Sequence, residues 1–437
     1  MIAPSIARGP LEIERSSRKV IATHQADRLT ELIRSFLNRN QFYSKKFRRA
    51  RLSINGLAFP DDLQKLPLTT KAELIDDQSS SPPWGTGLSE PVSSFSRYNQ
   101  TSSTTGNPLR WIDTPESWRW MLGCWDAVYK AARVSASDRI LFPFSFGPFL
   151  GFWTAFDAGV RMGAFCIPTG GMTSESRLAL IETLEPTVIC CTPTYALRLL
   201  DVASENRNRH LDSCSVRTVI VAGEPGGSIP STRRRIESGW GARVIDHHGL
   251  TEVGPLSYEC WEAPGFLHLN ETEFIVEILK PGTDQIVPDG QQGELIVTNL
   301  GRTASPVICY RTGDIVVRTR EKCSCGRTTA RLVGGVLART DDMINVKGVN
   351  VFPTAIESVV RSFQEVVEFQ TTVIARKAMR SLSVTIEVDG SIKEPSTVEH
   401  EVERKLHEAL GLSISVTSVE LGTLPRFDMK ARRFIVE

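Results

Sequence analysis

The sequence predicts an α/β protein: a large N-terminal α/β domain with parallel sheets, followed by a small α+β C-terminal domain. Three observations lead to this prediction. The chain has 437 residues, which is more than one hydrophobic core usually organises. From about residue 115 to 300, short β-rich runs alternate with helical patterns, which is typical of parallel sheets covered by helices. About the last hundred residues have a different order, with one helix, two strands, a second helix and a final strand.

Residues 24–46 are the first expected helix, because Leu29, Ile33 and Phe36 recur at helical spacing. The clearest strands of the large domain are short β-branched runs further along the chain. They are expected at 187–191, 218–222, 243–246 and 293–298. Parallel sheets bind ligands in the loops that follow the carboxyl ends of their strands. A binding site is therefore expected in the segments after these runs.

The small domain is expected to begin near residues 338–342. Its elements are predicted as a helix at 353–363, strands at 369–375 and 382–388, a second helix and a strand at 413–419. Ser396 and Glu399 have the spacing of a capping box at the start of the second helix, and Gly411 is of the type that commonly ends one. We therefore divide the chain into domains at 1–338 and 339–437.

Composition and charge argue against several function classes. The apolar content of 41%, the charged content of 23% and the net charge of +1 give no reason to expect a nucleic acid or a membrane surface as partner. The first residues lack the apolar core of a signal peptide, and no window approaches about 18 consecutive apolar residues. Nine cysteines without a secretory signal indicate a reducing compartment, so a cytoplasmic location is expected.

A run of small hydroxyl residues has the composition of a phosphate-binding loop. Small residues let a phosphate approach backbone N–H groups, and hydroxyls add hydrogen bonds. A Walker A motif is excluded because the run has no Gly-Lys-Ser/Thr. Taken alone, the run is better interpreted as a solvated linker. Its members are Thr101, Ser102, Ser103, Thr104, Thr105 and Gly106.

Further motifs along the chain favour a phosphate-binding loop over a solvated linker at residues 101–106. They are AGEP at 222–225, DHHGLTE at 246–252, YRTGD at 310–314, ARTDD at 338–342, KGVNVFP at 347–353 and LPRFDMK at 424–430. With these motifs in this order, the sequence resembles the adenylate-forming (acyl/aryl-CoA synthetase) superfamily, and it is most similar to the phenylacetate–CoA ligase branch. The resemblance extends from about residue 95 to the C-terminus.

The resemblance implies a reaction in two halves. A carboxylate attacks the α-phosphate of ATP to give an acyl-adenylate and pyrophosphate, and the thiol of coenzyme A then displaces AMP. Such an enzyme mainly positions groups and spreads charge, with Mg²⁺ on the phosphates. The small domain would be a mobile lid that rotates about Asp341 between the two halves. The expected substrate is an aromatic or arylacetic acid.

The resemblance also implies the catalytic residues. The 101–106 run would wrap the β- and γ-phosphates of ATP. Glu252 would ligate Mg²⁺, and Thr251 would contact the α-phosphate. Lys430 would reach the substrate carboxylate and the α-phosphate, where its charge stabilises the pentavalent transition state.

The adenosine site is implied in the same way. Asp246 would accept a hydrogen bond from the adenine amino group, beside Gly249, and His248 would pack on the base where the family commonly has an aromatic residue. Glu224 would line the adenine side.

Asp314 would accept both ribose hydroxyls, because a carboxylate can accept two hydrogen bonds at once, and Arg339 would assist it.

Three positions depart from the family pattern. Ser103 and Ala338 replace a usual Gly, and Asn107 replaces a usual Lys.

A structural zinc site is expected from three cysteines and one histidine. Cys323 and Cys325 have the spacing of a metal knuckle, and Cys260 and His268 lie upstream. Members of the branch carry a similar arrangement, in which Zn²⁺ would pin two loops together and take no part in catalysis. Buried thiols beside an unrelated histidine remain the alternative, because spacing alone does not close the geometry.

The acid pocket is expected around the aromatic run FPFSFGPFLGFW at 142–153. Its glycines leave room for a planar ligand beside phenylalanine rings, although part of the run also fits a hydrophobic core. No Lys or Arg is obvious in these runs to bind a second charge. By resemblance, the pocket residues are Phe146, Gly147, Gly170, Gly171 and Tyr195.

Two other functions remain open. The acyl acceptor could be a carrier-protein thiol or an amine in place of coenzyme A. A catalytically silent nucleotide-binding protein is conceivable because of Ser103 and Asn107, but Lys430 and Glu252 argue against it. The expected partners are a small carboxylic acid, ATP and coenzyme A, and a homodimer is left open.

Overall fold

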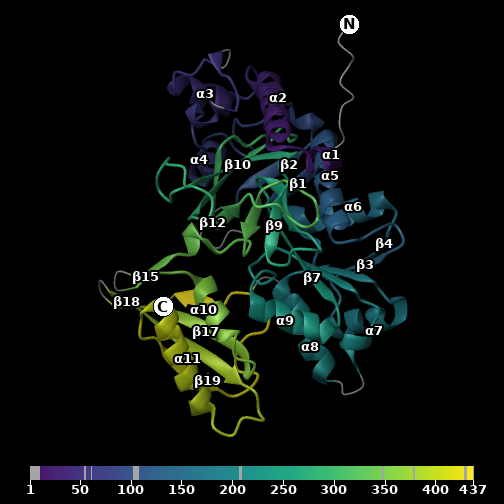
Figure 1. The fold of residues 1–437 in the computed structure, drawn as a ribbon, viewed down its shortest axis with the longest axis vertical. Helices are drawn as coiled ribbons and strands as arrows, with labels where there is room; N and C mark the ends of the chain where they lie inside the picture. Colours follow the sequence, from purple (N-terminus) through teal and green to yellow (C-terminus); the bar gives the residue numbers. More distant parts are fainter. Residues whose placement is uncertain are drawn as a thin grey trace.

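The computed structural model describes residues 10–53, 56–60, 62–101, 108–205, 209–346, 349–376, 379–427 and 431–436. Figure 1 shows a large part that contains the N-terminal helices and the main sheet, and a smaller part built from the C-terminal segment. The predicted fold class is confirmed, with a large sheet that contains parallel strands and a separate C-terminal sheet.

The N-terminal helices correct one prediction. In place of a single helix over 24–46, the chain forms α2 (Arg18–Phe36) and α3 (Gln41–Arg49). Between them the backbone of Asn40 is extended, and its side chain accepts a hydrogen bond from the N–H of Tyr43 at 3.1 Å. A short polar side chain that bonds to the backbone in this way starts a new helix. The other helices before the main sheet are α1 (Pro10–Ile13) and α4 (Lys71–Ser80), with 3₁₀ turns η2 (Leu63–Lys65) and η3 (Val92–Ser94).

The described residues form a 12-stranded main sheet, and one half of it is parallel, in the order β7-β6-β5-β3-β4. The predicted strands at 187–191, 218–222 and 243–246 are confirmed as β5, β6 and the first half of β7. The strands are β3 (Arg139–Phe142), β4 (Phe165–Pro168), β5 (Val188–Cys191), β6 (Thr218–Val221) and β7 (Arg243–Leu250). The helices are α5 (Pro115–Ala131), α6 (Leu150–Met162), α7 (Ser174–Leu184), α8 (Pro193–Glu205) and α9 (Pro230–Trp240), with η4 at Leu211–Ser213.

The other half of the sheet is antiparallel, which the sequence analysis did not anticipate. The predicted strand at 293–298 is confirmed as β11, but both its neighbours run antiparallel to it. The reason is the connection, because residues 280–291 form turns without the helix that usually carries the crossover between parallel strands. The strands are β8 (Gly254–Glu259), β9 (Phe266–Leu269), β10 (Phe274–Leu279), β11 (Gln292–Asn299), β12 (Tyr310–Thr319), β13 (Arg331–Val333) and β14 (Ala338–Arg339). A separate hairpin joins β1 (Arg97–Gln100) to β2 (Arg110–Asp113).

Two apolar layers cover the two faces of the parallel strands. Side chains alternate between the faces, so Cys190 packs with Ile140 and Ile220 towards α5 and α6. Cys191 instead packs with Ile189, Val219 and the residues of α7, α8 and α9. The strands are therefore buried on both sides, as is usual for parallel sheets, and their carboxyl ends meet at one edge.

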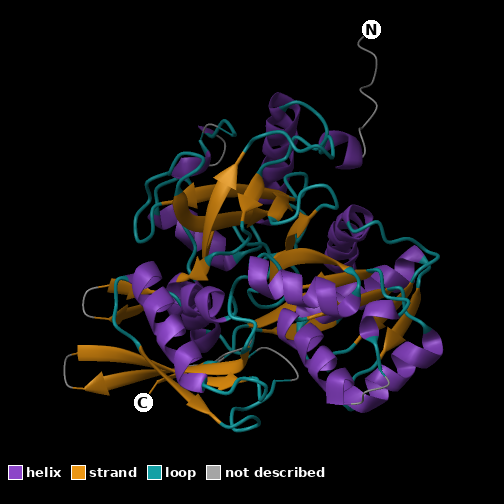
Figure 2. Ribbon diagram, turned by 60° about the horizontal axis from the view of Figure 1, so that its bottom comes forward, coloured by secondary structure: helices purple, strands orange, loops and turns teal. Residues whose placement is uncertain are grey.

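The C-terminal part has its own core and sheet. Its strand order is β19-β18-β17-β20, and Figure 2 shows these strands beside the two helices of the domain. The buried cluster of this part runs from Val346 to Val416 and contains no residue of the large sheet. The elements are η5 (Thr340–Asp342), β15 (Ile344–Val346), β16 (Val349–Val351), α10 (Pro353–Val360), β17 (Val366–Arg376), β18 (Met379–Val388), α11 (Pro395–Leu410), β19 (Ser415–Val419) and β20 (Phe434–Val436).

The expected capping box of α11 is wrong. The helix begins at Pro395, with Glu394 as a cap residue that makes no side-chain capping bond. Glu399 instead accepts hydrogen bonds from the N–H and hydroxyl of Ser418 on β19. Proline has the backbone angle of a first helical residue, so it sets the start without a box. Gly411 ends the helix with a left-handed backbone, as predicted.

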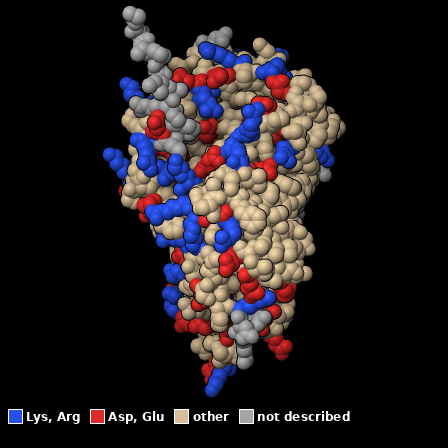
Figure 3. All heavy atoms as spheres, turned by 90° about the vertical axis from the view of Figure 1, so that its right-hand side faces the viewer, with Lys and Arg blue, Asp and Glu red and all other residues tan. Residues whose placement is uncertain are grey.

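The surface carries both signs of charge. Basic and acidic side chains are interspersed on the face shown in Figure 3. None of the helices in the described part of the chain has both the length and the apolar character that crossing a membrane requires.

Candidate active site

The segment at 246–252 lies where the main sheet changes from parallel to antiparallel. The first four residues of β7 pair with β6 in parallel, ending at Asp246 opposite Val221. From His247 onward, β7 pairs antiparallel with β8, with an irregular register between His248 and Gly249. Asp246 therefore lies at the carboxyl edge of the parallel strands, where α/β sheets usually bind ligands.

Asp246 is held between the end of β8 and the loop that follows β6. Its N–H donates to Glu259 at 2.8 Å, and its carboxylate accepts from the hydroxyl of Ser228. A Cβ on Gly227 would lie 2.6 Å from the carboxyl carbon of Asp246, so only glycine fits there. Burial raises the pKa of Asp246, against the opposing effects of the Ser228 hydrogen bond and the Arg233 charge.

His248, Asp314 and Arg339 form a hydrogen-bonded triad. Nε2 of His248 lies 3.0 Å from Oδ2 of Asp314, and Nη1 of Arg339 lies 2.6 Å from Oδ1. The register of β12 and β14 sets Asp314 opposite Arg339. Burial alone would raise the pKa of Asp314, but the hydrogen bond and charge of His248 and the charge of Arg339 outweigh it and lower the pKa. The carboxylate is therefore ionised, and both its oxygens have partners.

Glu252 is buried beside a phenol and an ammonium group. The hydroxyl of Tyr310 donates to its Oε1 at 3.0 Å, and Nζ of Lys71 lies 3.8 Å from the same oxygen. Burial, and next the charge of Glu252, raises the pKa of Tyr310 well above its usual value, so the phenol stays a donor. Lys71 lies outside every motif, so no sequence pattern pointed to it.

A buried ion pair fixes the backbone of Thr251 and Glu252. Arg302 and Asp113 both have side chains that are 0% exposed, and Nε of Arg302 donates to Oδ1 of Asp113 at 2.6 Å. Nη1 of Arg302 donates to the carbonyls of Thr251, at 2.6 Å, and Glu252, at 3.1 Å. Asp113 lies on β2, so the pair ties the proposed metal-binding segment to the β1–β2 hairpin. No motif pointed to this pair.

Thr101 lies at the end of β1, where the loop of the same hairpin begins. Its N–H donates to the carbonyl of Leu109 at 3.0 Å, and its hydroxyl accepts from the N–H of Leu109 at 3.0 Å. Its hydroxyl is thus bonded to the backbone of the opposite strand. The remaining members of the expected phosphate loop, Ser102, Ser103, Thr104, Thr105 and Gly106, lie outside the described residues, as does Asn107.

Three residues expected in the site lie near the boundary between the two domains in the structure or in the sequence: Glu224, expected on the adenine side, Asp341, expected as the hinge, and Lys430, expected as the catalytic lysine. Oε1 of Glu224 accepts from the N–H of Thr194 at 2.8 Å, and Oε2 accepts from the N–H of Ala431 at 2.9 Å. Asp341 lies in η5, with Oδ2 at 3.4 Å from Nη2 of Arg339. Lys430 lies outside the described residues, directly before Ala431.

The residues expected in the acid pocket are only partly brought together. Phe146 packs on Trp153 with ring centroids 4.8 Å apart, and a Cβ on Gly170 would lie 3.3 Å from the Phe146 ring. Gly147 lies in the same aromatic loop, where its Cβ would approach Phe149 at 3.0 Å, whereas Gly171 has open space around its Cβ position.

Tyr195 belongs to the apolar layer on the other face of the sheet. Its hydroxyl accepts from Nη1 of Arg177 at 2.6 Å, and Nη2 of Arg177 donates to the carbonyl of Thr169 at 3.0 Å. Arg177 is therefore a buried cation beside the 170–171 loop that the sequence analysis did not find.

The structure brings together the four expected zinc ligands. The donor atoms of Cys260, His268, Cys323 and Cys325 all lie within 4.8 Å of one another. The two sulfurs of Cys260 and Cys323 are 3.6 Å apart, and Cys325 Sγ is 3.5 Å from His268 Nε2. A tetrahedron with ordinary Zn–S and Zn–N bonds has edges of about 3.8 Å between sulfurs and about 3.6 Å between sulfur and nitrogen. The cluster therefore has the dimensions of a tetrahedral zinc site.

The surroundings of the cluster also suit a metal. Burial, with the charges of Arg327 and Arg331, lowers the pKa of His268 to about 3, so its imidazole is neutral. Its other nitrogen, Nδ1, is held by the hydroxyl of Thr329 at 3.0 Å, a typical orienting contact for a metal-bound histidine. Arg327 lies 3.5 Å from the sulfur of Cys325 and balances thiolate charge.

The buried ring of His247 predicts a loss of stability in acid. Its Nδ1–H donates to the carbonyl of Ser257 at 2.8 Å, and the ring lies 4.5 Å from Trp125. Burial lowers the pKa of His247 to about 4. The hydrogen bond to Ser257 acts in the opposite direction, and the charge of His248 lowers the pKa further. The unfolded imidazole titrates near 6.5, so between about pH 6.5 and 4 only the unfolded chain gains this proton, and stability falls as pH falls.

The expected contribution is about 1.4 kcal/mol per pH unit across that window. Thermal unfolding midpoints from pH 7.5 to 4.5 should fall more steeply for the wild type than for His247→Gln. His400, which is exposed on α11, provides the control, because His400→Gln should follow the wild type. Parallel slopes for wild type and His247→Gln would contradict the assignment of a neutral buried ring.

The fold and these residues define a nucleotide-binding enzyme of the adenylate-forming class, and the chain belongs to the AMP-binding enzyme family. The family model for the AMP-binding enzyme matches residues 95–303, and that for the AMP-binding enzyme C-terminal domain matches residues 348–437. The phenylacetate-coenzyme A ligase of Escherichia coli (strain K12) is 31% identical over 432 residues, which cover 96% of each chain. The enzyme of the same name from Thermus thermophilus is 29% identical over 437 residues, covering 95% of this chain and 96% of the relative. The resemblance to the phenylacetate–CoA ligase branch is thus confirmed.

Solved structures of 2-hydroxyisobutyryl-CoA ligase indicate which domain arrangement is present. Its postadenylation state in complex with 2-HIB-AMP matches with a TM-score of 0.90 at 25% identity, covering 96% of this chain and 89% of that chain. Its thioesterification state with 2-HIB-AMP and CoA matches with a TM-score of 0.74 at 25% identity, covering 98% and 92%. The arrangement of the two domains here is therefore more similar to the postadenylation state.

Proposed function

We propose that this protein, an AMP-forming acid–CoA ligase, activates an aromatic or arylacetic acid with ATP and transfers the acyl group to coenzyme A. The observation that carries the proposal is the ionised, buried carboxylate of Asp314 on β12, beside His248 of β7. It is held between His248 and Arg339, a position suited to accept the two hydroxyls of a ribose. The full-length similarity to phenylacetate-coenzyme A ligases supports the same reaction.

The first half-reaction needs charge stabilisation more than acid–base chemistry. A carboxylate oxygen of the acid forms a bond to the α-phosphorus, and the bond to the bridging oxygen breaks as pyrophosphate leaves with the electron pair. Lys430 is proposed to place its ammonium group against the α-phosphate, with Thr251 as a second contact. In the second half, the thiol of coenzyme A gives its proton to solvent and its sulfur bonds to the acyl carbon. The bond from that carbon to the phosphate oxygen breaks, and AMP leaves with the electron pair.

Mg²⁺ is proposed to bind at Glu252. A single buried carboxylate, with the remaining positions left to phosphate oxygens and water, is the usual donor set for this ion in nucleotide sites. The Tyr310 phenol on Oε1 fixes the carboxylate, and Arg302 fixes the backbone beneath it. The ion would shield the phosphate charges, and the segment 101–106 would supply N–H groups to the β- and γ-phosphates.

The acid is proposed to bind beside an aromatic cluster formed by the loop after β3 and the first two turns of α6. Phe144 and Phe152 stack with ring centroids 4.0 Å apart, and Phe146 lies edge-on to Phe156 at 5.4 Å. A planar ring packs favourably against such a surface. The relatives named as phenylacetate ligases support an arylacetic acid over an aliphatic one.

The domain division is proposed at residues 338–342, with Asp341 as the hinge of the lid. The neighbouring Arg339 on β14 still belongs to the main sheet and holds Asp314. A rotation just after it would therefore move the small domain and leave the ribose site intact.

All nine cysteines are free, which fits the reducing cytoplasm that the sequence predicts.

ATP–pyrophosphate exchange tests the proposed function. Purified protein with Mg²⁺ should exchange label fastest with phenylacetate or benzoate, more slowly with 2-hydroxyisobutyrate, and not without acid. Adding coenzyme A should then give the thioester, detected by mass spectrometry. Exchange without a thioester would indicate a carrier-protein thiol or an amine as the acceptor. No exchange with any acid would overturn the ligase assignment in favour of a silent nucleotide-binding protein.

A structural Zn²⁺ is proposed at Cys260, His268, Cys323 and Cys325. Elemental analysis should find one zinc per chain. Loss of an outer-shell contact alone typically lowers metal affinity by about 10- to 100-fold. Cys323→Ser removes one of the four ligands, so it should lower zinc affinity by at least as much. It should also lower the thermal midpoint, because the ion ties the loop after β8 to the loop between β12 and β13.

Cys214→Ser is the matched control for this prediction, because Cys214 is half-buried and lies outside the cluster. This variant should keep its zinc and its thermal midpoint. Metal-free wild-type protein that is as stable as the metal-containing protein would contradict the structural role.

A further inference from the structure

The carboxylate of Glu224 joins the large domain to the small domain. It lies in the turn after β6, at the carboxyl edge of the parallel strands. Oε1 accepts from the N–H of Thr194 in the first turn of α8, and Oε2 accepts from the N–H of Ala431 in the C-terminal segment. The nitrogen of Ala431 is bonded to the carbonyl carbon of Lys430. Glu224 thus holds the N–H of the residue that directly follows the proposed catalytic lysine in the chain.

The side of this contact that belongs to the large domain is well fixed. Thr194 N–H is one of the unpaired donors at the start of a helix, and a carboxylate is a favoured acceptor there. The next donor, the N–H of Tyr195, is taken by the hydroxyl of Thr192 at 3.1 Å. Both oxygens of Glu224 are therefore engaged in charge-assisted hydrogen bonds, one within its own domain and one across the interface.

The C-terminal segment is equally well fixed to the small domain. The N–H of Thr371 on β17 donates to the carbonyl of Arg433 at 2.7 Å. The guanidinium of Arg433 makes two bonds to Glu368, at 2.7 and 3.1 Å. Its contact with Thr194 Oγ1 in the large domain is longer, at 3.5 Å. Movement of the small domain therefore carries Ala431 with it, and this movement breaks the hydrogen bond from the N–H of Ala431 to Glu224.

The arrangement of the domains links this contact to one half of the reaction. The present arrangement is more similar to the postadenylation state of 2-hydroxyisobutyryl-CoA ligase than to its thioesterification state. Figure 1 shows the small domain against the side of the large domain that carries α8 and α9. We propose that Glu224 is a positioning residue for adenylation, which seats Lys430 by holding the N–H of Ala431 and releases it when the lid rotates. This inference rests on the proposed function.

Separated half-reactions test it. Glu224→Ala should slow ATP–pyrophosphate exchange by about 10- to 100-fold through kcat, with the KM for ATP nearly unchanged. Thioester formation from synthetic acyl-adenylate and coenzyme A should stay at the wild-type rate. Glu224→Gln keeps one acceptor oxygen, so its exchange rate should fall less than that of Glu224→Ala. It serves as the second variant if the alanine variant is unstable.

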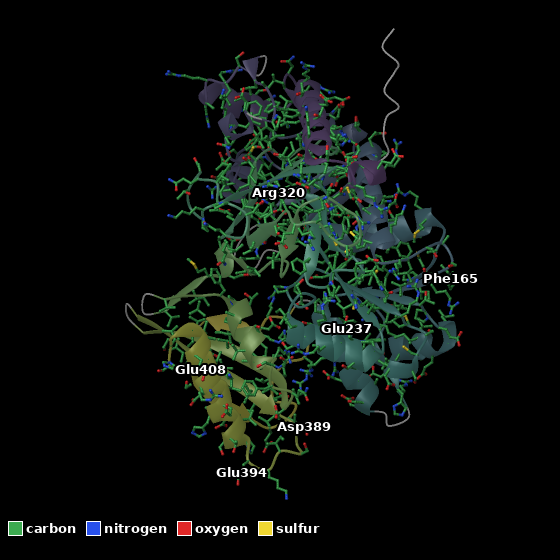
Figure 4. All side chains as sticks on the ribbon, viewed as in Figure 1. Phe165, Glu237, Arg320, Asp389, Glu394 and Glu408 are labelled. Atoms are coloured by element: carbon green, nitrogen blue, oxygen red, sulfur yellow. The ribbon has the colours of Figure 1, made fainter. Side chains whose placement is uncertain are left out.

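Glu237→Gln is the control. Figure 4 labels Glu237 on α9, and its carboxylate accepts from a backbone N–H, that of Val244 at 3.1 Å, within the large domain. This variant should exchange like the wild type. The inference is overturned if Glu224→Ala exchanges at the wild-type rate, if it slows both half-reactions equally, or if it raises only the KM for ATP, as the adenine-side role predicts. A wild type that shows no exchange would instead refute the proposed function.

Discussion

Lys430→Ala is expected to reduce ATP–pyrophosphate exchange by about 100- to 1000-fold, the usual cost of removing one group that stabilises transition-state charge. In the proposed mechanism the ammonium group acts on charge that develops at the α-phosphate during attack, so its loss should affect kcat. ATP binding should change little, because the proposed ribose carboxylate, Mg²⁺ ligand and phosphate loop all belong to the large domain. Exchange kinetics and calorimetric titration with ATP measure the two effects separately.

Lys405→Ala provides the control within the same domain. Lys405 lies on α11 and pairs with Glu408 at 3.2 Å, with both side chains 49% exposed. It should keep wild-type exchange. If Lys430→Ala also kept it, the lysine would have no role in adenylation, and the lid would have to supply another cation.

Asp113→Ala should have the largest effect on stability, about 3 to 5 kcal/mol. The substitution leaves the guanidinium of Arg302 buried without its counter-ion, in a site where both partners are fully buried. It also frees the group that holds the carbonyls of Thr251 and Glu252. We therefore expect weaker ATP binding in the fraction that still folds. Denaturant unfolding and the KM for ATP measure these losses.

Glu116→Ala is the exposed counterpart. Glu116 pairs with Arg119 at 2.8 Å, but the two side chains are 68% and 69% exposed, so solvent screens the pair and the loss of stability should be far smaller than for Asp113→Ala. Equal stability for Asp113→Ala and Glu116→Ala would show that the buried pair does not hold the site together.

The sequence predicted those features that short segments determine. Strands β5 and β6 are runs of β-branched and apolar residues, and burial on both faces follows from that pattern. The division of α2 from α3 at Asn40 was missed because the apolar stripe continues across it, while one side-chain hydrogen bond decides the break. The antiparallel half of the sheet was missed because strand direction depends on connections and not on composition.

The candidate site shows the same division. Each motif contains residues that are near in sequence, so Asp246, His248 and Glu252 could be named in advance. Their partners come from distant segments: Lys71 beside Glu252, and Asp113 paired with Arg302, which is 189 positions away. Glu224 was assigned to the adenine side from its motif, yet its carboxylate meets Ala431, which is 207 positions away. One sequence contains no record of which distant residues meet, so these contacts required the structure.

The most direct test of the whole account is a crystal structure with a non-hydrolysable ATP analogue and Mg²⁺. We expect the ribose hydroxyls on Asp314, the base beside His248 and Asp246, the metal ion on Glu252, and the β- and γ-phosphates against residues 101–106. A nucleotide with its triphosphate bound elsewhere, or with its ribose away from Asp314, would contradict the account.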